Sequence, residues 1–107
     1  MESTQLTARE KIESVIANNP VVLFMKGNPR FPQCGFSAAA VKMLADAGAG
    51  EFAHVNVLDD AQVREGIKSY SSWPTIPQLY IKQQFVGGAD IMRELHETGE
   101  LSRLINE

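Results

Sequence analysis

The residue best suited to chemistry is Cys34, the only cysteine in the sequence. It follows a short apolar run, Val21–Met25, and a loop that contains glycine and two prolines. After it, Phe36, Ala40 and Leu44 repeat at helical spacing. We therefore expect Cys34 at a helix N-terminus, where free backbone N–H groups and the helix dipole stabilise a thiolate. The thiolate is the form of cysteine that attacks disulfides and binds metals.

A lone cysteine can instead be a small buried hydrophobe. The glycine, lysine and prolines of residues 26–32 favour an exposed loop, so we rank the buried reading second. Lys26 and Arg30 also place positive charge near Cys34 in the sequence, and positive charge favours the thiolate.

The cysteine count limits what Cys34 can do. Position 37 is serine, so Cys34 has no partner in a Cys-x-x-Cys motif and any disulfide cycle needs an external thiol. A two-iron, two-sulfide (2Fe-2S) cluster usually takes four thiolates, and one chain supplies one. Both chemistries therefore require thiols from outside the chain.

Four separate motifs carry a resemblance to a known family: Lys26, Cys34-Gly35-Phe36-Ser37, Trp73-Pro74-Thr75-Ile76-Pro77 and Gly87-Gly88-Ala89-Asp90. From about Val21 to the C-terminus, the sequence resembles monothiol glutaredoxins of the CGFS type. The resemblance implies a thioredoxin-like fold and a glutathione site. It also implies a 2Fe-2S cluster between two protomers, held by Cys34 of each chain and two glutathione molecules. Cys34 is then both the catalytic thiol and the metal ligand.

The elements that must position these motifs alternate along the chain. Thr7–Glu10 reads as a capping box that starts a first helix. We further predict a strand over 21–25, a helix over 35–47, a strand over 52–57 and a helix capped by Asp59 and Asp60. Strands over 77–82 and 85–86 follow, and then helical residues 91–105 with a break at Thr98-Gly99. This order predicts an α/β protein with the thioredoxin-like fold, a four-stranded mixed sheet with helices on both faces. The turn Lys82–Gln84 lacks glycine, so we expect a residue with positive φ there.

Glutathione is an anionic, extended tripeptide, so its site needs cations and a free strand edge. Lys26, Arg64 and Lys68 are the candidate cations, and the last two share one face of the third helix because they lie four residues apart. The resemblance assigns glutathione contacts to Lys26 and Arg64. For Lys68, an ordinary solvated charge is the preferred reading.

Thr75-Ile76-Pro77 is the second part of the expected site. The sequence alone favours a trans peptide before Pro77, since only about 5–6% of such bonds are cis. The resemblance implies instead a cis proline that faces Cys34, with the N–H and C=O of Ile76 paired to glutathione. Trp73 and Pro74 would shape the approach.

Gly87-Gly88-Ala89-Asp90 is the third part. Two glycines permit close backbone approach, and Asp90 can accept an amine while helix N–H groups receive a carboxylate. A plain turn with a capping aspartate fits the spacing equally well. The resemblance places the γ-glutamyl end of glutathione on Ala89 and Asp90. Family members often have a second cysteine at the position of Ala89, and its absence removes an internal disulfide partner for Cys34.

The bulk properties bound the remaining possibilities. The 107 residues fit one domain, 1–107, and the net charge of −3 gives no sign of nucleic-acid binding. No apolar run approaches the ~20 residues of a membrane span. One cysteine suits a reducing compartment and residues 1–5 lack a targeting pattern, so we expect a cytoplasmic protein, although a processed organellar protein would look the same. His54 and His96 lack metal-ligand spacing.

Three functions remain open. The leading one is a glutathione-dependent 2Fe-2S carrier, a homodimer that passes its cluster to apo iron–sulfur proteins. The alternative is an enzyme, a weak monothiol oxidoreductase acting on protein–glutathione mixed disulfides. The third is an adaptor that binds BolA-like proteins through a shared cluster. Phe36, Ser37 and the insert Gly27–Pro32 resemble the cluster-binding class and favour the carrier.

Overall fold

The computed structural model describes residues 6–107, so the expectation for residues 1–5 lies outside it. The elements are α1 (Ala8–Asn18), β1 (Val21–Met25), α2 (Gly35–Asp46), β2 (Ala53–Asn56), α3 (Ala61–Ser71), β3 (Gln78–Ile81), β4 (Gln84–Gly87), α4 (Ala89–Glu97) and α5 (Glu100–Asn106). This is the predicted order, and the expected break at Thr98-Gly99 separates α4 from α5.

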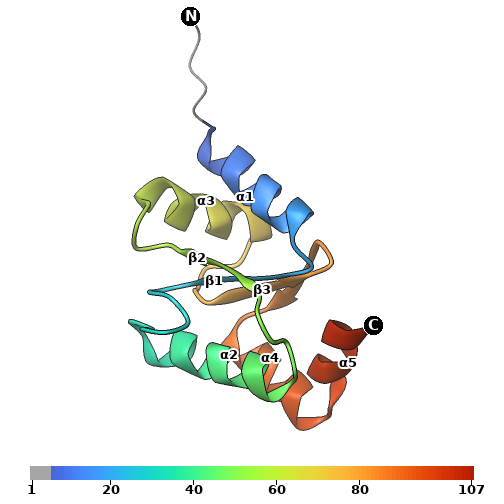
Figure 1. Cartoon of the computed structure of the whole chain (residues 1–107). Coiled ribbons are helices and arrows are strands. Elements are labelled where there is room, and N and C mark those ends of the chain that lie inside the picture. The colour runs from blue at the N-terminus through green and yellow to red at the C-terminus, as the bar shows by residue number, and fades with distance from the viewer. Residues whose placement is uncertain (1–5) are drawn as a thin grey trace, which may run out of the picture.

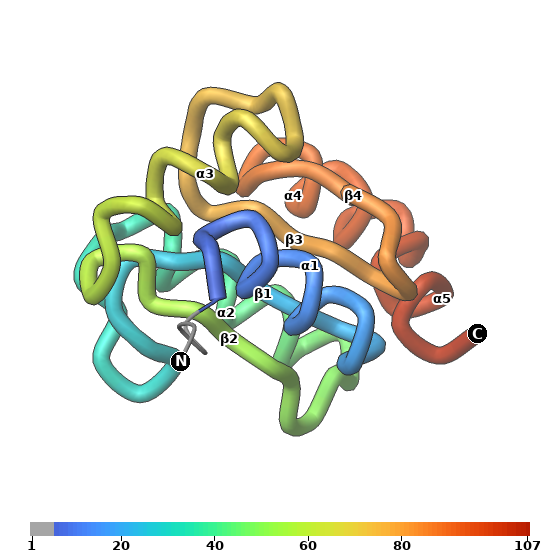
Figure 2. Tube along the Cα trace, turned by 90° about the horizontal axis from the view of Figure 1, so that it is seen from above, coloured from blue at the N-terminus to red at the C-terminus, as the bar shows by residue number. Residues whose placement is uncertain are grey.

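The molecule has three layers, with the sheet in the middle (Figure 1). The strand order is β2-β1-β3-β4. β1 runs parallel to β2 and antiparallel to β3, and β3 runs antiparallel to β4. Helices α1 and α3 cover one face of the sheet, and α2 and α4 cover the other (Figures 1 and 2). The predicted four-stranded mixed sheet with helices on both faces is confirmed.

β1 is the centre of the core. All five of its residues are buried, and they alternate between the two faces of the sheet. Leu23 and Met25 pack with the α2 and α4 side, whereas Val22 and Phe24 pack with the α1 and α3 side. A strand covered on both faces needs apolar residues at every position, which is why this segment shows no polar alternation.

The local signals at the helix ends and the hairpin act as predicted. The Thr7 hydroxyl accepts the N–H of Glu10, whose carboxylate accepts the N–H of Thr7, and this capping box starts α1. The Asp60 carboxylate caps α3. In the hairpin turn, both Lys82 (φ 51°) and Gln83 (φ 70°) have positive φ, which gives the turn the twist of the flanking strands without glycine.

Phe36 departs from the expectation that it continues the apolar face of α2. Its side chain is 60% exposed, while Ser37 next to it is completely buried. The buried stripe of α2 runs through Ser37, Ala40 and Leu44, so Phe36 lies at its margin. The aromatic ring is therefore available at the surface beside Cys34.

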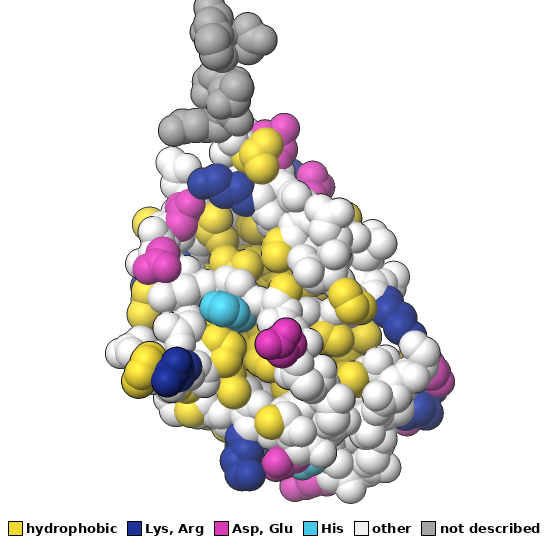
Figure 3. Space-filling view, viewed as in Figure 1, with side chains coloured by type: hydrophobic (Ala, Val, Ile, Leu, Met, Phe, Trp, Pro, Cys, Tyr) yellow, Lys and Arg dark blue, Asp and Glu magenta, His cyan; other side chains and the backbone are white. Residues whose placement is uncertain are grey.

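The face on which the edge strand β2 lies shows apolar side chains gathered between the α1–α3 layer and α2, with most charged groups toward the rim (Figure 3).

Of the helices within residues 6–107, none combines the length and apolar character that crossing a membrane requires.

Candidate functional site

A cleft of about 400 Å³ lies where the segments after β1, α3 and β4 meet. Seven of its lining residues are those that the sequence assigned to the site, namely Lys26, Cys34, Arg64, Ile76, Pro77, Ala89 and Asp90. Lys68, Phe36, Trp73 and Pro74 also line it. The fold thus brings into one cavity all the candidate site residues, which lie up to 64 positions apart in the sequence.

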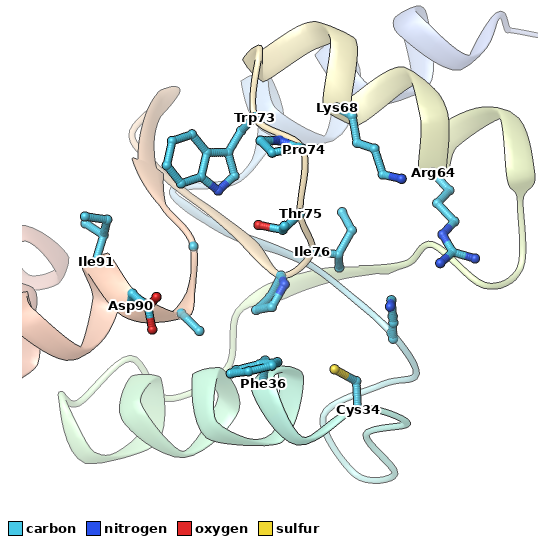
Figure 4. Close-up of a pocket in the computed structure, with 14 residues that line it drawn as sticks. Cys34, Phe36, Arg64, Lys68, Trp73, Pro74, Thr75, Ile76, Asp90 and Ile91 are labelled. Atoms are coloured by element: carbon cyan, nitrogen blue, oxygen red, sulfur yellow. The ribbon is translucent and has the colours of Figure 1, made fainter.

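Cys34 occupies the N-cap position of α2, as predicted, with an extended backbone. The backbone N–H of Ser37 lowers the pKa of the Cys34 thiol most strongly. The N–H of Phe36, the Lys26 ammonium and the Ser37 hydroxyl also lower this pKa, and partial burial opposes them. Cys34 is partly exposed and not in a disulfide, so its sulfur can meet a ligand at the mouth of the cleft (Figure 4).

Ser37 has a structural role that the sequence did not indicate, since there it marks only the absence of a second cysteine and part of the resemblance to the cluster-binding class. Its buried hydroxyl accepts a hydrogen bond from the backbone N–H of Lys26, at 3.0 Å. The C=O of Lys26 accepts the N–H of Gln33 at 2.9 Å. Both backbone groups of Lys26 are thereby tied to the cysteine loop. The available signal was a polar residue on the apolar stripe of α2.

Asn56, at the end of β2, anchors the same loop and was also missed. Its side-chain oxygen accepts the N–H of Gly27 at 2.9 Å and the N–H of Leu58 at 3.0 Å. Gly27 has φ +89°, and a Cβ there would lie 2.5 Å from the carbonyl oxygen of Phe31. Glycine is therefore required where the loop folds back on itself.

Three cations reach the cleft. Arg64 and Lys68 extend into it from α3, on the shared helix face that their spacing predicted (Figure 4). Lys68 also pairs with Glu65, with Nζ and Oε2 3.4 Å apart. Because the Glu65 carboxylate is largely exposed, this ion pair is weak and Lys68 can turn to an anion in the cleft. Lys26 directly follows β1 and is partly buried.

Ile76 presents free backbone groups to the cleft. The antiparallel ladder between β1 and β3 ends at the pair Phe24–Gln78, and continuing the same register would pair Met25 with Pro77 and then Lys26 with Ile76. Lys26 cannot take part, since its N–H and C=O are bonded to Ser37 and Gln33. Within residues 6–107, no protein group hydrogen bonds to the N–H or C=O of Ile76. The Ile76–Pro77 peptide is cis, as the resemblance implied.

The N-terminus of α4 forms the opposite wall. Gly88 is the N-cap residue and offers no side chain to the helix N–H groups. The alternative that Asp90 merely caps this helix is therefore wrong, because Asp90 lies in the first turn and lines the cleft. A Cβ on Gly88 would lie 3.3 Å from both the Pro77 oxygen and the Trp73 indole nitrogen, so the chain passes close to this loop.

The arrangement is suited to an extended, anionic thiol compound. Arg64 and Lys68 stand at one end, the Ile76 backbone lies in the middle, and Asp90 with the α4 N-terminus stands at the other end (Figure 4). Cys34 faces this path from α2, so a thiol held along it would lie beside the Cys34 sulfur. In the part of the chain that the structure describes, no three His, Cys, Asp or Glu residues group to hold a metal, and His54 and His96 lie on β2 and α4.

A sheet of this topology with a cysteine at the N-terminus of the helix after its first strand defines a thioredoxin-like protein. Comparison with known proteins narrows the class. The family model named Glutaredoxin matches residues 21–86. Monothiol glutaredoxin-5, mitochondrial, from Lachancea kluyveri is 54% identical over 101 residues, covering 92% of this chain and 71% of the relative.

A bacterial relative and a solved structure agree. Glutaredoxin 4 of Escherichia coli K12 is 48% identical over 101 residues, covering 94% of this chain and 87% of the relative. The solution structure of reduced poplar apo GrxS14 matches with a TM-score of 0.78 at 46% identity, over 90% of this chain and 87% of that one. The chain belongs to the glutaredoxin family, and its one cysteine makes it a monothiol glutaredoxin.

Proposed function

We propose that this glutaredoxin binds glutathione in the cleft and, as a dimer, carries a 2Fe-2S cluster that it delivers to apo iron–sulfur proteins. The observation that carries the proposal is the position of the Cys34 sulfur, partly exposed and beside a cleft whose groups match the ends and the backbone of glutathione.

Each part of glutathione has a complementary group. The glycyl carboxylate suits Arg64 and Lys26, with Lys68 as a further cation. The cysteinyl backbone suits the free N–H and C=O of Ile76, which would pair with it as a neighbouring strand does. The γ-glutamyl amine suits Asp90, and its carboxylate suits the N–H groups at the start of α4 near Ala89.

The cluster is cargo that this chain can ligate only in part. Cys34 supplies one thiolate, so glutathione and a second copy of the chain must supply the others. A thiol with a lowered pKa is suited to this role, because thiolate is the form that binds iron. Glutathione is held by noncovalent contacts alone and can yield its place to a cysteine of the recipient.

The lowered pKa of the Cys34 thiol also favours the alternative enzyme reaction. The Cys34 thiolate would attack the glutathione sulfur of a protein–glutathione disulfide, forming a Cys34–glutathione disulfide and releasing the protein thiolate. A second glutathione thiolate would then attack that disulfide, yielding glutathione disulfide and restoring Cys34. The same cleft would hold the glutathione part in both steps.

The test is anaerobic purification with glutathione, followed by visible absorption, iron analysis and size-exclusion chromatography. We expect a coloured dimer and a colourless monomeric apo form. Cys34→Ser should fold normally and lose both iron and colour. A holo monomer, or a dimer that keeps its cluster after glutathione is removed, would contradict this ligand set. Colourless wild-type protein that reduces mixed disulfides would favour the enzyme instead.

Partners and location remain predictions. We expect apo iron–sulfur proteins as recipients and BolA-like proteins as a further binding class. The relatives include a protein described as mitochondrial and one from a bacterium, so the expectation of a cytoplasmic protein needs its own localisation experiment.

A further inference from the structure

Gln78 is a buried polar residue outside the predicted site. Among residues 6–107, Ser37 and Gln78 are the buried polar side chains, and both are completely inaccessible to solvent. Burying a polar group is costly unless its hydrogen bonds are made, so each of these side chains is expected to have specific hydrogen-bond partners. Ser37 holds Lys26. Gln78 has an equally specific set of partners.

The side-chain amide of Gln78 reaches back from β3 to the loop before it. Its Nε2 donates to the C=O of Trp73 at 3.1 Å and to the C=O of Thr75 at 3.2 Å. Its Oε1 faces the hydroxyl of Tyr80, 3.5 Å away on the same face of the strand. The two amide protons are therefore used on two carbonyls of one exposed loop, while the strand itself stays in register with β1.

The bond to Thr75 fixes the direction of the Ile76 N–H. Both groups belong to one planar peptide unit, in which the C=O and the N–H point in opposite directions. When Gln78 holds the Thr75 oxygen toward the core, the Ile76 N–H points away from the core. That direction is toward the cleft, because Ile76 lines the cleft and its N–H has no partner within residues 6–107.

We propose that Gln78 is a positioning residue for the ligand: through Trp73 and Thr75 it holds the free backbone of Ile76 in the orientation that binds the main chain of a glutathione-like thiol peptide. This inference rests on the proposed function. Gln78 itself does not line the cleft, and it acts on binding only through the loop.

A purely structural role for Gln78 makes a different prediction. If its bonds only satisfy two loop carbonyls, their loss lowers the free energy of unfolding and leaves the glutathione affinity of the folded protein unchanged. If its bonds orient Ile76, the folded variant binds glutathione more weakly than a control variant with a similar loss of stability. Cys34 provides an internal reference, because the groups that lower its pKa are Ser37, Phe36 and Lys26, not Gln78.

The test compares two variants with wild type. Gln78→Glu keeps the size but replaces the donor with a carboxylate that repels both carbonyls, and Gln78→Met keeps the length without any donor. Ile16→Val, at a buried position in the core cluster that contains Tyr80 and away from the cleft, controls for lost stability. Glutathione affinity is measured by calorimetry, and the pH dependence of Cys34 alkylation by iodoacetamide is measured in parallel.

We expect both Gln78 variants to bind glutathione about tenfold more weakly or worse, with an unchanged alkylation profile, and Ile16→Val to bind as wild type does. Should Gln78→Glu fail to fold, Gln78→Met alone decides the comparison. Wild-type affinity in a folded Gln78 variant would overturn the inference while leaving the proposed function intact. A wild-type protein that does not bind glutathione would overturn the proposed function and, with it, the inference.

Discussion

Removing the hydroxyl of Ser37 should lower stability and have little effect on the acidity of Cys34. In Ser37→Ala the Lys26 N–H loses its 3.0 Å hydrogen bond, and the site of the lost hydroxyl is completely buried, away from bulk water. An unsatisfied backbone donor of this kind costs about 1–3 kcal/mol. The Cys34 thiol keeps the backbone N–H groups of Ser37 and Phe36 and the charge of Lys26, and the first of these lowers its pKa most.

Urea unfolding measures the first effect, and the pH profile of iodoacetamide alkylation measures the second. We expect the free energy of unfolding of Ser37→Ala to fall by about 1–3 kcal/mol. The pKa of Cys34 should rise slightly and stay below that of an ordinary cysteine. Ser69→Ala, an exposed serine on α3, is the control and should change stability by less than about 0.5 kcal/mol. An ordinary cysteine profile in Ser37→Ala would refute the argument that backbone N–H groups dominate.

Three further predictions follow from the same loop. Lys26→Ala should weaken glutathione binding by about 1.5–3 kcal/mol, the usual value of a charge-assisted contact. Unchanged affinity in calorimetry would show that the Lys26 ammonium is solvated and does not contact glutathione. Gly27→Ala should destabilise the protein by at least about 1–2 kcal/mol in urea unfolding, because φ is +89° and its Cβ would meet the Phe31 oxygen; wild-type stability would show that the loop rearranges freely. Because the pKa of Cys34 is lowered in the folded state, its ionisation stabilises the fold most above the unfolded pKa of about 8.5, and this contribution is lost as pH falls through the folded pKa. The stability difference between wild type and Cys34→Ser should therefore grow with rising pH across this window, and a difference independent of pH would contradict the lowered pKa.

The fold could be predicted from the sequence because the patterns that define its helices and strands are local. The capping box at Thr7, the unbroken apolar run of β1 and the cap at Asp60 each act within a few residues. Residue type and position indicated Cys34 and the cations Lys26 and Arg64, whereas the family resemblance supplied the glutathione contacts of Ile76 and Ala89, which spacing alone does not give. The cis peptide before Pro77 shows the difference, since spacing alone favoured trans.

The residues that support the cleft could not be predicted from the sequence, because their hydrogen-bond partners are distant in the chain or the orientation of their side chains depends on the completed fold. Ser37 bonds to Lys26 across 11 positions, and Asn56 bonds to Gly27 across 29 positions. Gln78 lies on a strand buried on both faces, and nothing in its neighbours indicates that its amide turns back to the preceding loop. Phe36 was misplaced because helical periodicity does not say where the covering layer ends.

The unpaired backbone N–H and C=O of Ile76 have a consequence for which amino-acid substitutions this protein tolerates. A peptide group offers the same donor and acceptor whichever residue other than proline carries it, so another β-branched side chain such as valine at position 76 would leave that contact intact. Substitutions at position 76 therefore leave the backbone N–H and C=O in place, whereas substitutions at the neighbouring residues that orient them do not. Gln78, Pro77 and Gly88 should therefore vary less among descendants of this sequence than Ile76 itself.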